Sequence, residues 1–418
     1  MSADQPLSRR LRVLVLTSTF PRWVGDTEPR FVLDLCRYLA KDAEVLVLAP
    51  HAPGAARAEE LEGVRVQRFR YFVPRWQAVA YEGGITQRLR SNRWRLLQLP
   101  FFFASLLWAT WRSIRTWSPD VIHAHWIVPQ AFVACIAAGR AVPILCTSHG
   151  GDLHALRGPF FRYVKAWTLT RCNAVTVVSE SMVPHVLTLA PSADVAVIPM
   201  GTDLTDLFVP PPASAQREAN RLLFVGRLVA KKGVDYLLEA FAVIARSRPD
   251  LRLTIAGRGP LETALREKAK ALGIADRVTF LGGVPHAELP ALYQKAAVAV
   301  FPFVVAADGD QEGFGLVTVE AMGCGCPVIA SDLPAVRDAV EPGVTGVLVP
   351  AGDVAALAEA IRALLEDSGL REMIARQALA RAQERFDWAV ITARYLDRLQ
   401  CLATMPPSAP ATNRTAHL

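Results

Sequence analysis

The chain has 418 residues, of which 52% are hydrophobic and 20% charged, with a formal net charge of +7. This length predicts two or three domains, and this apolar content suits large buried cores rather than a disordered chain. The seven cysteines are odd in number and scattered, which favours free thiols in a reducing compartment over disulfides. Cys324 and Cys326 have no second pair or nearby histidines, so the sequence gives no structural zinc motif.

Short runs rich in Val, Ile and Leu alternate with helical stretches along the whole chain. The first run follows arginines and is followed by Pro21 and Arg22, so it predicts a strand rather than a signal peptide. In the first half, strands are predicted at residues 12–18, 44–49, 64–69, 120–125, 143–148 and 174–179. The pattern restarts at residues 221–226, 251–257, 278–282, 297–302, 326–331 and 346–350. Continuous apolar strands between helices indicate parallel sheets, and so an α/β protein with two doubly wound, Rossmann-like domains.

A proline-rich polar stretch separates the two series of strands. It covers residues 209–220 and has few apolar anchors, so we interpret it as a linker. The domains predicted on either side are residues 1–208 and residues 221–385. Residues 404–418 are polar and proline-containing, and we expect them to be disordered.

Polar and basic side chains follow several of the predicted strands. Arg227 and Lys232 follow residues 221–226, Arg258 follows the next strand, Glu312 follows a later one through a loop, and His149 follows a strand of the first domain. Doubly wound sheets bind ligands at the carboxyl ends of their strands. These side chains are therefore expected to converge in a cleft between the domains.

The stretch EGFGLVTVEAMGCGCPVIAS, residues 312–331, combines a glycine-rich turn with two glutamates. Gly313 and Gly315 suit a loop that opens a short helix, and the N–H groups at a helix start favour an anion such as phosphate. Glu312 precedes that helix and Glu320 lies within it, so both carboxylates can accept hydrogen bonds from sugar hydroxyls. The alternative for Glu320 is a local cap or salt bridge.

Several motifs together resemble the retaining family-four glycosyltransferases, which have the GT-B fold. The motifs are GRLVAKKGVD (226–235), AGRGP (256–260), FLGGV (280–284) and the glutamate pair, which matches the family's E-x7-E pattern. The resemblance covers nearly the whole chain, since DVIHAHW (120–126), SHGGD (148–152), VIPMGTD (197–203) and GVLVPAGD (346–353) fall in the expected order. The loop ADGDQEGFG also resembles enzymes that build bacterial exopolysaccharide and lipopolysaccharide side chains.

The resemblance implies a donor site that binds a UDP- or GDP-linked sugar. Arg227 and Lys232 would neutralise the donor diphosphate, because a forked guanidinium and a compact ammonium both suit phosphate oxygens. The backbone at Gly315, Leu316 and Val317 would add N–H donors to the same phosphates. Arg258 is placed with these donor-binding residues.

The glutamates and one histidine would hold the sugars of the donor. Glu320 would bind the ribose hydroxyls, and Glu312 would orient the transferred sugar beside the diphosphate. His149 would reach that sugar from the facing domain, with the alternative that it only satisfies a backbone carbonyl. The family likeness also leads us to expect a helix at residues 386–403 that returns to the first domain.

The reaction implied is transfer of a sugar with retention of its anomeric configuration, without a metal or other cofactor. The acceptor would be a saccharide or a polyprenyl-diphosphate-linked saccharide in bacterial surface polysaccharide synthesis. The leaving phosphate would act as base for the incoming hydroxyl, and Glu312 is not assigned as a nucleophile. Asp308 and Asp310 form a D-G-D sequence that binds metal in a different fold, and here they are read as an exposed turn.

Two other classes of enzyme share this architecture. An NAD-dependent oxidoreductase would need G-x-G-x-x-G after a strand, and the nearest candidate, at residues 257–262, lacks the third glycine. A nucleotide-sugar epimerase or a phosphorylase remains an alternative. Met200, Thr202 and Asp338 depart from the family's usual residues, which puts the hinge and outer pocket in question rather than the diphosphate site.

Residues 65–115 carry ten arginines and one acidic residue, Glu82, with aromatic residues between them. Such a segment suits a membrane interface, with arginines on anionic headgroups and rings at the acyl boundary. Gln98 and Pro100 interrupt its apolar run, so it is too broken to span a bilayer. We therefore expect a cytoplasmic protein that is peripheral on the inner face of the cytoplasmic membrane, and no nucleic acid partner. The alternative for the apolar run is a core helix.

Overall fold

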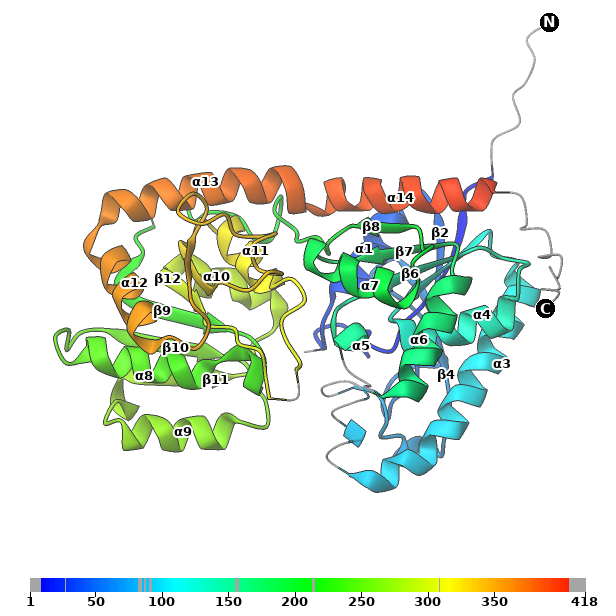
Figure 1. Ribbon diagram of the computed structural model, residues 1–418, viewed down its shortest axis with the longest axis horizontal. Coiled ribbons are helices and arrows are strands. Elements are labelled where there is room, and N and C mark those ends of the chain that lie inside the picture. The colour runs from blue at the N-terminus through cyan, green and yellow to red at the C-terminus, as the bar shows by residue number, and fades with distance from the viewer. Residues whose placement is uncertain are drawn as a thin grey trace, which may run out of the picture.

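Two separate parallel sheets organise the chain into two lobes that lie side by side (Figure 1). The computed structural model describes residues 9–26, 28–81, 85, 88–89, 92–154, 158–212, 215–307 and 309–405. The predicted Asp308 and nearly all of the predicted tail, residues 406–418, lie outside this range. The two lobes confirm the predicted α/β class with two Rossmann-like domains.

The first lobe contains an eight-stranded sheet in the order β3-β4-β2-β1-β5-β6-β7-β8. Its predicted strands are β1 (Arg12–Leu16), β2 (Glu44–Pro50), β4 (Val64–Phe69), β5 (Val121–His125), β6 (Ile144–Ser148) and β7 (Ala174–Val177). The strands β3 (Ala58–Leu61) and β8 (Val195–Val197) were not predicted. Both are short edge strands: β3, which is antiparallel to β4, is mostly polar and solvent-facing, and β8 has only three residues.

Helices cover both faces of this sheet, as in a doubly wound fold (Figure 1). They are α1 (Phe31–Leu39), α3 (Leu99–Trp117), α4 (Phe132–Ala138), α5 (Gly151–His154), α6 (Pro159–Arg171) and α7 (Val183–Leu189). Short turns of tighter or wider helix join them at η1 (Pro74–Trp76), η2 (Arg93–Gln98), η3 (Ile127–Ala131) and η4 (Glu180–Met182).

The second lobe contains a six-stranded, all-parallel sheet in the order β11-β10-β9-β12-β13-β14. The strands are β9 (Glu218–Val225), β10 (Arg252–Ala256), β11 (Val278–Gly282), β12 (Ala296–Phe301), β13 (Val328–Ser331) and β14 (Val347–Val349). The stretch 209–220, expected as a linker, includes the start of β9. Glu218 pairs with Ala296, and the neighbouring Arg217 donates to the carbonyls of Tyr293, Ala296 and Cys324, so the end of that stretch is fixed to the second lobe.

The helices of the second lobe include the one that carries the E-x7-E motif. They are α8 (Val234–Ala245), α9 (Glu262–Ala271), α10 (Leu289–Lys295), α11 (Leu316–Gly323), α12 (Val354–Glu366) and α13 (Ser368–Phe386), with turns η5 (Ala230–Lys232), η6 (Ala275–Arg277) and η7 (His286–Glu288). The short helix predicted after Gly315 is α11, which begins at Leu316 and ends at Gly323.

The chain passes between the lobes at two places that lie next to each other. Thr202 N donates to Phe386 O at 2.9 Å, and Trp388 N donates to Thr202 O at 3.2 Å. A Cβ on Gly201 would lie 2.5 Å from the Trp388 ring, so only glycine fits there. The two unusual residues Met200 and Thr202 are both buried at this crossing.

After the second crossing, α14 (Trp388–Thr404) lies on the first lobe, in line with α13 along one edge of the molecule (Figure 1). The Asp387 side chain caps it by accepting from Ala389 N at 2.8 Å. Tyr395 is fully buried, and its hydroxyl donates to Ile198 O at 3.0 Å. The α14 helix is therefore part of the core of the first lobe.

All seven cysteines are free thiols, and Cys401 is exposed. Among the described helices, none is both long enough and apolar enough to cross a bilayer.

Candidate active site

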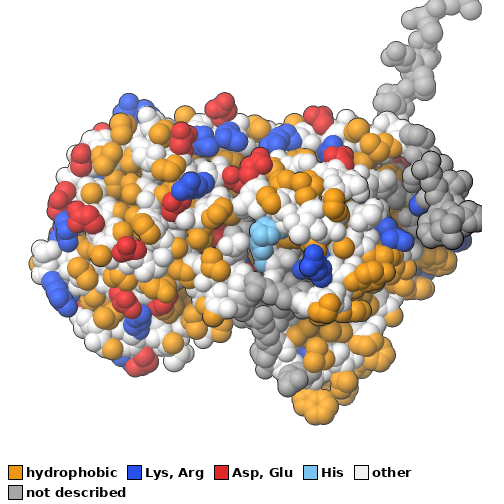
Figure 2. Space-filling model, viewed as in Figure 1, with side chains coloured by type: hydrophobic (Ala, Val, Ile, Leu, Met, Phe, Trp, Pro, Cys, Tyr) orange, Lys and Arg blue, Asp and Glu red, His pale blue; other side chains and the backbone are white. Residues whose placement is uncertain are grey.

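The loop after β6 and the loop before α11 meet between the lobes, and Figure 2 shows a notch between the two lobes, here called the cleft. On the second lobe, the loops after β9 and β10 are held tightly together. Gly226 N donates to Ala256 O at 3.0 Å, and Leu228 N donates to Arg258 O at 2.9 Å. A Cβ on Gly257 would lie 1.8 Å from Gly226 O, and the φ of Gly257 is +149°, so the turn requires glycine. This packing fixes the backbone that carries Arg227 and Arg258.

The two predicted arginines differ in their surroundings, although both side chains are exposed. Arg227 lies within electrostatic reach of Glu28 on the first lobe and of Asp310. Arg258 lies over the Gly282 and Gly283 backbone, where an added Cβ would be 3.3 to 3.5 Å from its Nε. Arg227 thus faces the gap between the lobes, whereas Arg258 lies beside the end of β11.

Lys232 and Glu312 form an ion pair, with Lys232 Nζ 2.6 Å from Glu312 Oε2. Only 13% and 14% of their side chains are exposed, and the ammonium also lies 4.5 Å from the Phe303 ring centre. Burial alone would raise the pKa of Glu312, but Lys232 and then Lys231 outweigh it and lower the pKa to about 2. Glu312 is therefore ionised at neutral pH, and its partner is one of the predicted phosphate ligands.

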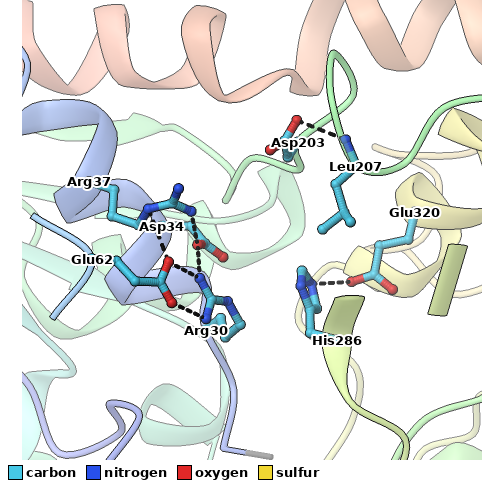
Figure 3. Close-up of polar contacts among 8 residues, drawn as sticks. All are labelled: Arg30, Asp34, Arg37, Glu62, Asp203, Leu207, His286 and Glu320. Carbon is cyan, nitrogen blue, oxygen red and sulfur yellow. Dashed lines mark hydrogen bonds and ion pairs between the residues drawn. The ribbon is translucent and has the colours of Figure 1, made fainter. Parts of the chain in front are cut away.

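Glu320 lies inside α11 and is 6% exposed. Tyr293 donates to its Oε2 at 3.0 Å. On the other side, His286 Nε2 lies 3.9 Å from its Oε1, as Figure 3 shows. Burial raises the pKa of Glu320 to about 7, although the Tyr293 hydrogen bond acts in the opposite direction. No side chain caps α11, so the alternative of a helix cap does not hold for Glu320.

The start of α11 presents backbone donors beside Glu312. Gly315 caps the helix with a φ of +85°, a left-handed conformation that glycine adopts without strain. Leu316 and Val317 are half-buried, and the N–H groups of a first helical turn have no partner within the helix. N–H groups in this position suit an anion, so the geometry is compatible with the phosphate site expected from the sequence.

His149 follows β6 and lies among rings of the first lobe. Its Nε2 is 3.0 Å from His125 Nδ1, and its ring centre is 4.9 Å from that of Phe31 and 4.8 Å from that of Trp126. Burial lowers the pKa of His149 to about 3, so the ring is neutral at physiological pH. Its ring partner is thus a histidine rather than a backbone carbonyl.

Asp152 fixes the loop that carries His149. Its Oδ1 accepts from Ser148 Oγ at 2.9 Å and from His149 N at 3.2 Å, and its Oδ2 accepts from Ile127 N at 2.8 Å. The final aspartate of the SHGGD motif therefore orients the histidine through the backbone.

The lobes touch next to Glu312, which the sequence did not predict. A Cβ on Gly313 would lie 2.7 Å from His149 O, and a Cβ on Gly150 would lie 3.1 Å from Gly313 Cα. Gly150 in the SHGGD motif and Gly313 in the EGFG stretch were the only local signs in these two motifs that the loops approach each other closely. A second contact between the lobes is the hydrogen bond from Glu180 N to Asp338 Oδ2 at 2.7 Å, which gives Asp338 a position at the outer edge of the cleft.

A charged cluster on the first lobe faces His286 and was also missed (Figure 3). Arg30 Nη2 lies 2.7 Å from Glu62 Oε2 and 3.1 Å from Asp34 Oδ1, and Arg37 Nε lies 3.2 Å from Glu62 Oε2. Arg30, Asp34 and Arg37 follow one another at intervals of four and three residues, a spacing that places them on one face of a helix. Glu62 comes from the turn between β3 and β4, and no local pattern shows that this turn meets α1.

The D-G-D sequence is only partly described. Lys231 Nζ lies 3.1 Å from Asp310 Oδ1, so this carboxylate is paired with a lysine. Across the described residues, His, Cys, Asp and Glu side chains form no group of three that suits a metal ion.

Two Rossmann-like lobes around a cleft with basic side chains and a helix start define a GT-B nucleotide-sugar transferase. Residues 29–206 match the family described as Glycosyltransferase Family 4, and residues 211–381 match Glycosyl transferases group 1. The chain belongs to glycosyltransferase family 4, and it is a retaining glycosyltransferase that uses a nucleotide sugar.

Two mycobacterial enzymes are among the similar proteins. The glycogen synthase of Mycobacterium tuberculosis is 34% identical over 290 residues, which cover 66% of this chain and 67% of that protein. The phosphatidyl-myo-inositol mannosyltransferase of Mycobacterium leprae is 34% identical over 290 residues, which cover 68% of this chain and 74% of that protein.

Solved structures show the same fold. Sucrose-phosphate synthase from Thermosynechococcus elongatus has a TM-score of 0.73 at 23% identity, over 94% of this chain and 99% of that one. The Anabaena protein HepE, solved in complex with UDP, has a TM-score of 0.71 at 21% identity, over 94% of this chain and 100% of that one. These likenesses confirm the GT-B fold predicted from the sequence.

Proposed function

We propose that this enzyme transfers a sugar from a UDP- or GDP-linked donor to a saccharide or polyprenyl-diphosphate-linked acceptor in bacterial surface polysaccharide synthesis. The observation that carries the proposal is the buried Lys232–Glu312 pair, which lies between the start of α11 and the His149 loop. It combines a phosphate ligand, a ligand for sugar hydroxyls and a histidine from the facing lobe.

In this proposal the donor lies along the second lobe. Arg227, Lys232 and the first N–H groups of α11 hold the diphosphate, because ionised donors form the stronger hydrogen bonds to phosphate. Glu320 accepts from the ribose hydroxyls at the buried end, and Arg258 lies on the nucleotide side, next to Gly282 and Gly283.

Glu312 and His149 hold the transferred sugar from opposite lobes. The donor diphosphate would take over part of the Lys232 charge that Glu312 now holds, which leaves Glu312 oxygens to accept from sugar hydroxyls. The neutral His149 ring offers one nitrogen donor or acceptor beside its contact with His125.

The proposed chemistry needs no protein nucleophile. The bond between the anomeric carbon and the phosphate oxygen breaks as the acceptor hydroxyl attacks from the same face. The hydroxyl proton passes to the leaving phosphate oxygen, and Arg227, Lys232 and the α11 N–H groups stabilise the charge that develops there. Contact between the lobes at Gly150 and Gly313 would limit water access to the reacting carbon.

Replacing Arg227 or Lys232 by Ala tests the proposal. Each change removes a charge-assisted partner of the diphosphate, worth roughly 1.5–3 kcal/mol, so transfer should fall about ten-fold to more than a hundred-fold. The measurements are sugar transfer and the thermal shift produced by UDP and by GDP, which also identifies the nucleotide. Lys268→Ala, which removes an ion pair with Glu239 on remote helices, is the control. Wild-type transfer in both variants would exclude this diphosphate site.

We further propose that no metal ion takes part in the reaction, since side chains and helix N–H groups supply the positive charge. Transfer measured in EDTA should then equal transfer in added Mg²⁺ or Mn²⁺ within about two-fold. A strict requirement for either ion would instead assign Asp310, and with it Asp308, to metal binding.

We also propose that the enzyme works peripherally on the inner face of the cytoplasmic membrane. The α3 helix buries Phe102, Leu106 and Ala109 against the sheet and exposes a row of rings on its opposite side. The exposed apolar side chains of α3 and of η2 before it, which we name the aromatic ridge, are Trp94, Leu96, Leu97, Phe101, Trp108 and Trp111. Figure 2 shows hydrophobic surface gathered over α3, at the lower right. The apolar run is thus a core helix on one face and an exposed ridge on the other.

Arginines surround the aromatic ridge, although fewer than the sequence suggested. Arg112 and Arg115 stack on Trp108 and Trp111, with guanidinium carbons 5.5 and 4.7 Å from the ring centres. Arg68, by contrast, is 3% exposed and bonds Glu59 and Tyr81 inside the lobe. The aromatic ridge and its two stacked arginines support binding to an anionic membrane surface, which a lipid-linked acceptor would also require.

A further inference from the structure

A basic pocket lies between α5, α6 and α7 of the first lobe, outside the donor site. Its volume is about 520 Å³, within the range of small-molecule sites. Arg162, Lys165, His185, Leu153 and Thr188 are among its lining residues. Every charged side chain among the described lining residues is basic, so the pocket presents positive charge to whatever enters it.

Lys165 provides a fixed charge at the inner side of this pocket. It is 6% exposed, and its Nζ donates to Leu153 O at 2.8 Å. A buried ammonium costs solvation free energy, and a compact cation with several N–H donors suits phosphate oxygens. Arg162 and His185 are exposed, so they form the outer rim of the pocket, where an anion entering from solvent makes its first contacts.

The pocket adjoins the position proposed for the transferred sugar. Leu153 lies in α5, on the same short segment as His149. The His154 ring packs against the His185 ring, with centres 4.9 Å apart, and Gln311 Nε2 lies 3.5 Å from His154 Nε2. Gln311 directly precedes Glu312. A contiguous path of side chains therefore joins the pocket rim to the sugar-binding glutamate.

We propose that this pocket binds a phosphate or diphosphate group carried by the acceptor. The inference rests on the proposed glycosyl transfer, in which the acceptor approaches the donor sugar from the first lobe. An anion held by Arg162, Lys165 and His185 would place the acceptor's hydroxyls toward Glu312, because the path through His154 and Gln311 leads there. The same chemistry serves a lipid-linked diphosphate and a soluble sugar phosphate.

Anion binding is measured with the whole protein saturated with UDP or GDP, whichever binds, so that the donor diphosphate site is already filled. Inorganic pyrophosphate, glucose 1-phosphate and a polyprenyl diphosphate in phosphatidylcholine vesicles are the three probes. The variants are Arg162→Gln and His185→Gln. Arg171→Gln lies on the same helix and outside the pocket lining, so it is the matched control.

Wild type and Arg171→Gln should bind pyrophosphate alike, whereas Arg162→Gln should bind it about ten-fold more weakly, as expected for loss of a charge-assisted hydrogen bond. Loss of vesicle binding in the pocket variants identifies a lipid-linked acceptor, and loss of glucose 1-phosphate binding identifies a soluble one. Equal pyrophosphate affinity in wild type and in both pocket variants overturns the pocket assignment.

The two proposals fail in different ways. If neither nucleotide binds wild type, the donor site is wrong, and pyrophosphate titrations that compare wild type with Arg162→Gln then test the pocket by itself. If a nucleotide binds normally to Arg162→Gln while the pyrophosphate affinity of this variant equals that of wild type, only the pocket assignment is wrong.

Discussion

At the scale of single residues, Glu312 and Glu320 are two buried carboxyl groups in one cleft whose pKa values move in opposite directions. Burial acts to raise both pKa values. Lys232 and Lys231 nevertheless lower the pKa of Glu312 to about 2, whereas burial raises the pKa of Glu320 to about 7. Near neutral pH, Glu312 is an anion and Glu320 is about half protonated. The two ends of the proposed donor site therefore respond differently to pH.

Donor binding should strengthen as the pH rises through the pKa of Glu320. Ribose hydroxyls donate to the carboxylate form, so a bound donor favours loss of the proton. The affinity for a nucleotide sugar should increase about ten-fold between about pH 6 and about pH 8. Calorimetric titration at several pH values measures it, and a nucleotide sugar avoids the titration of a terminal phosphate.

Glu320→Gln is the matched variant, because its side chain keeps the size and cannot ionise. It should bind the donor more weakly at high pH and show little pH dependence. A slope in this variant equal to that of wild type would mean that another group controls the pH dependence.

At the scale of elements, the contact between the His149 loop and the loop before α11 limits what can occupy position 313. Gly313→Ala would place Cβ 2.7 Å from His149 O, so the two loops must separate. We expect transfer to fall about ten-fold while nucleotide affinity changes less than about two-fold, since the shift acts between the lobes. Steady-state kinetics and nucleotide titration measure the two effects.

Gly151→Ala is the control for this prediction, because an added Cβ at Gly151 meets no atom within 4 Å. It lies in the same loop region and should keep wild-type transfer. Unchanged transfer in Gly313→Ala would show that the contact between these loops is not needed for the reaction.

The elements also show how far the sequence predicts this fold. Buried parallel strands are continuous apolar runs, so β1, β5 and β12 were predicted within a few residues. The strand β3 was missed because it is a polar edge strand, stabilised mainly by its pairing with β4.

Only part of the candidate site was predicted from the sequence, because several of its contacts join segments that are far apart in the chain. The loops after strands pointed to Lys232 and Glu312, yet their mutual pairing is a tertiary contact without a local pattern. Glu62 was missed because only the complete sheet brings its turn to Arg30. The basic pocket around Lys165 is likewise assembled from three helices.

At the scale of the whole molecule, the aromatic ridge predicts binding to anionic membranes. Trp108 and Trp111 are 60% and 44% exposed, so Trp108→Ser with Trp111→Ser should leave the core intact. Flotation with liposomes of increasing anionic lipid content should recover wild type and lose most of this double variant. Arg112→Gln with Arg115→Gln should weaken flotation mainly at low salt and less at moderate salt, because added salt already screens the attraction of the arginines to anionic headgroups.

The arginines that precede α3 are less suitable for such a test. Arg88 Nε donates to Ala78 O and Arg95 Nη1 donates to Arg88 O, so replacing either disturbs the backbone. Arg90 and the Arg93 side chain lie outside the described residues. The control is Phe160→Ser, which removes an exposed ring from a different helix, α6. If wild type does not float with anionic liposomes, the membrane proposal is wrong.

The position of α14 has a consequence for synthesis on the ribosome. The first lobe is not complete until α14 covers His123 and Ile198, yet the whole second lobe is translated in between. At ordinary elongation rates that interval lasts roughly 10 to 40 s. During this time an apolar surface of the nascent first lobe stays open to chaperones or to aggregation. Slowing translation across the second lobe should therefore lower the yield of folded enzyme, although no residue has changed.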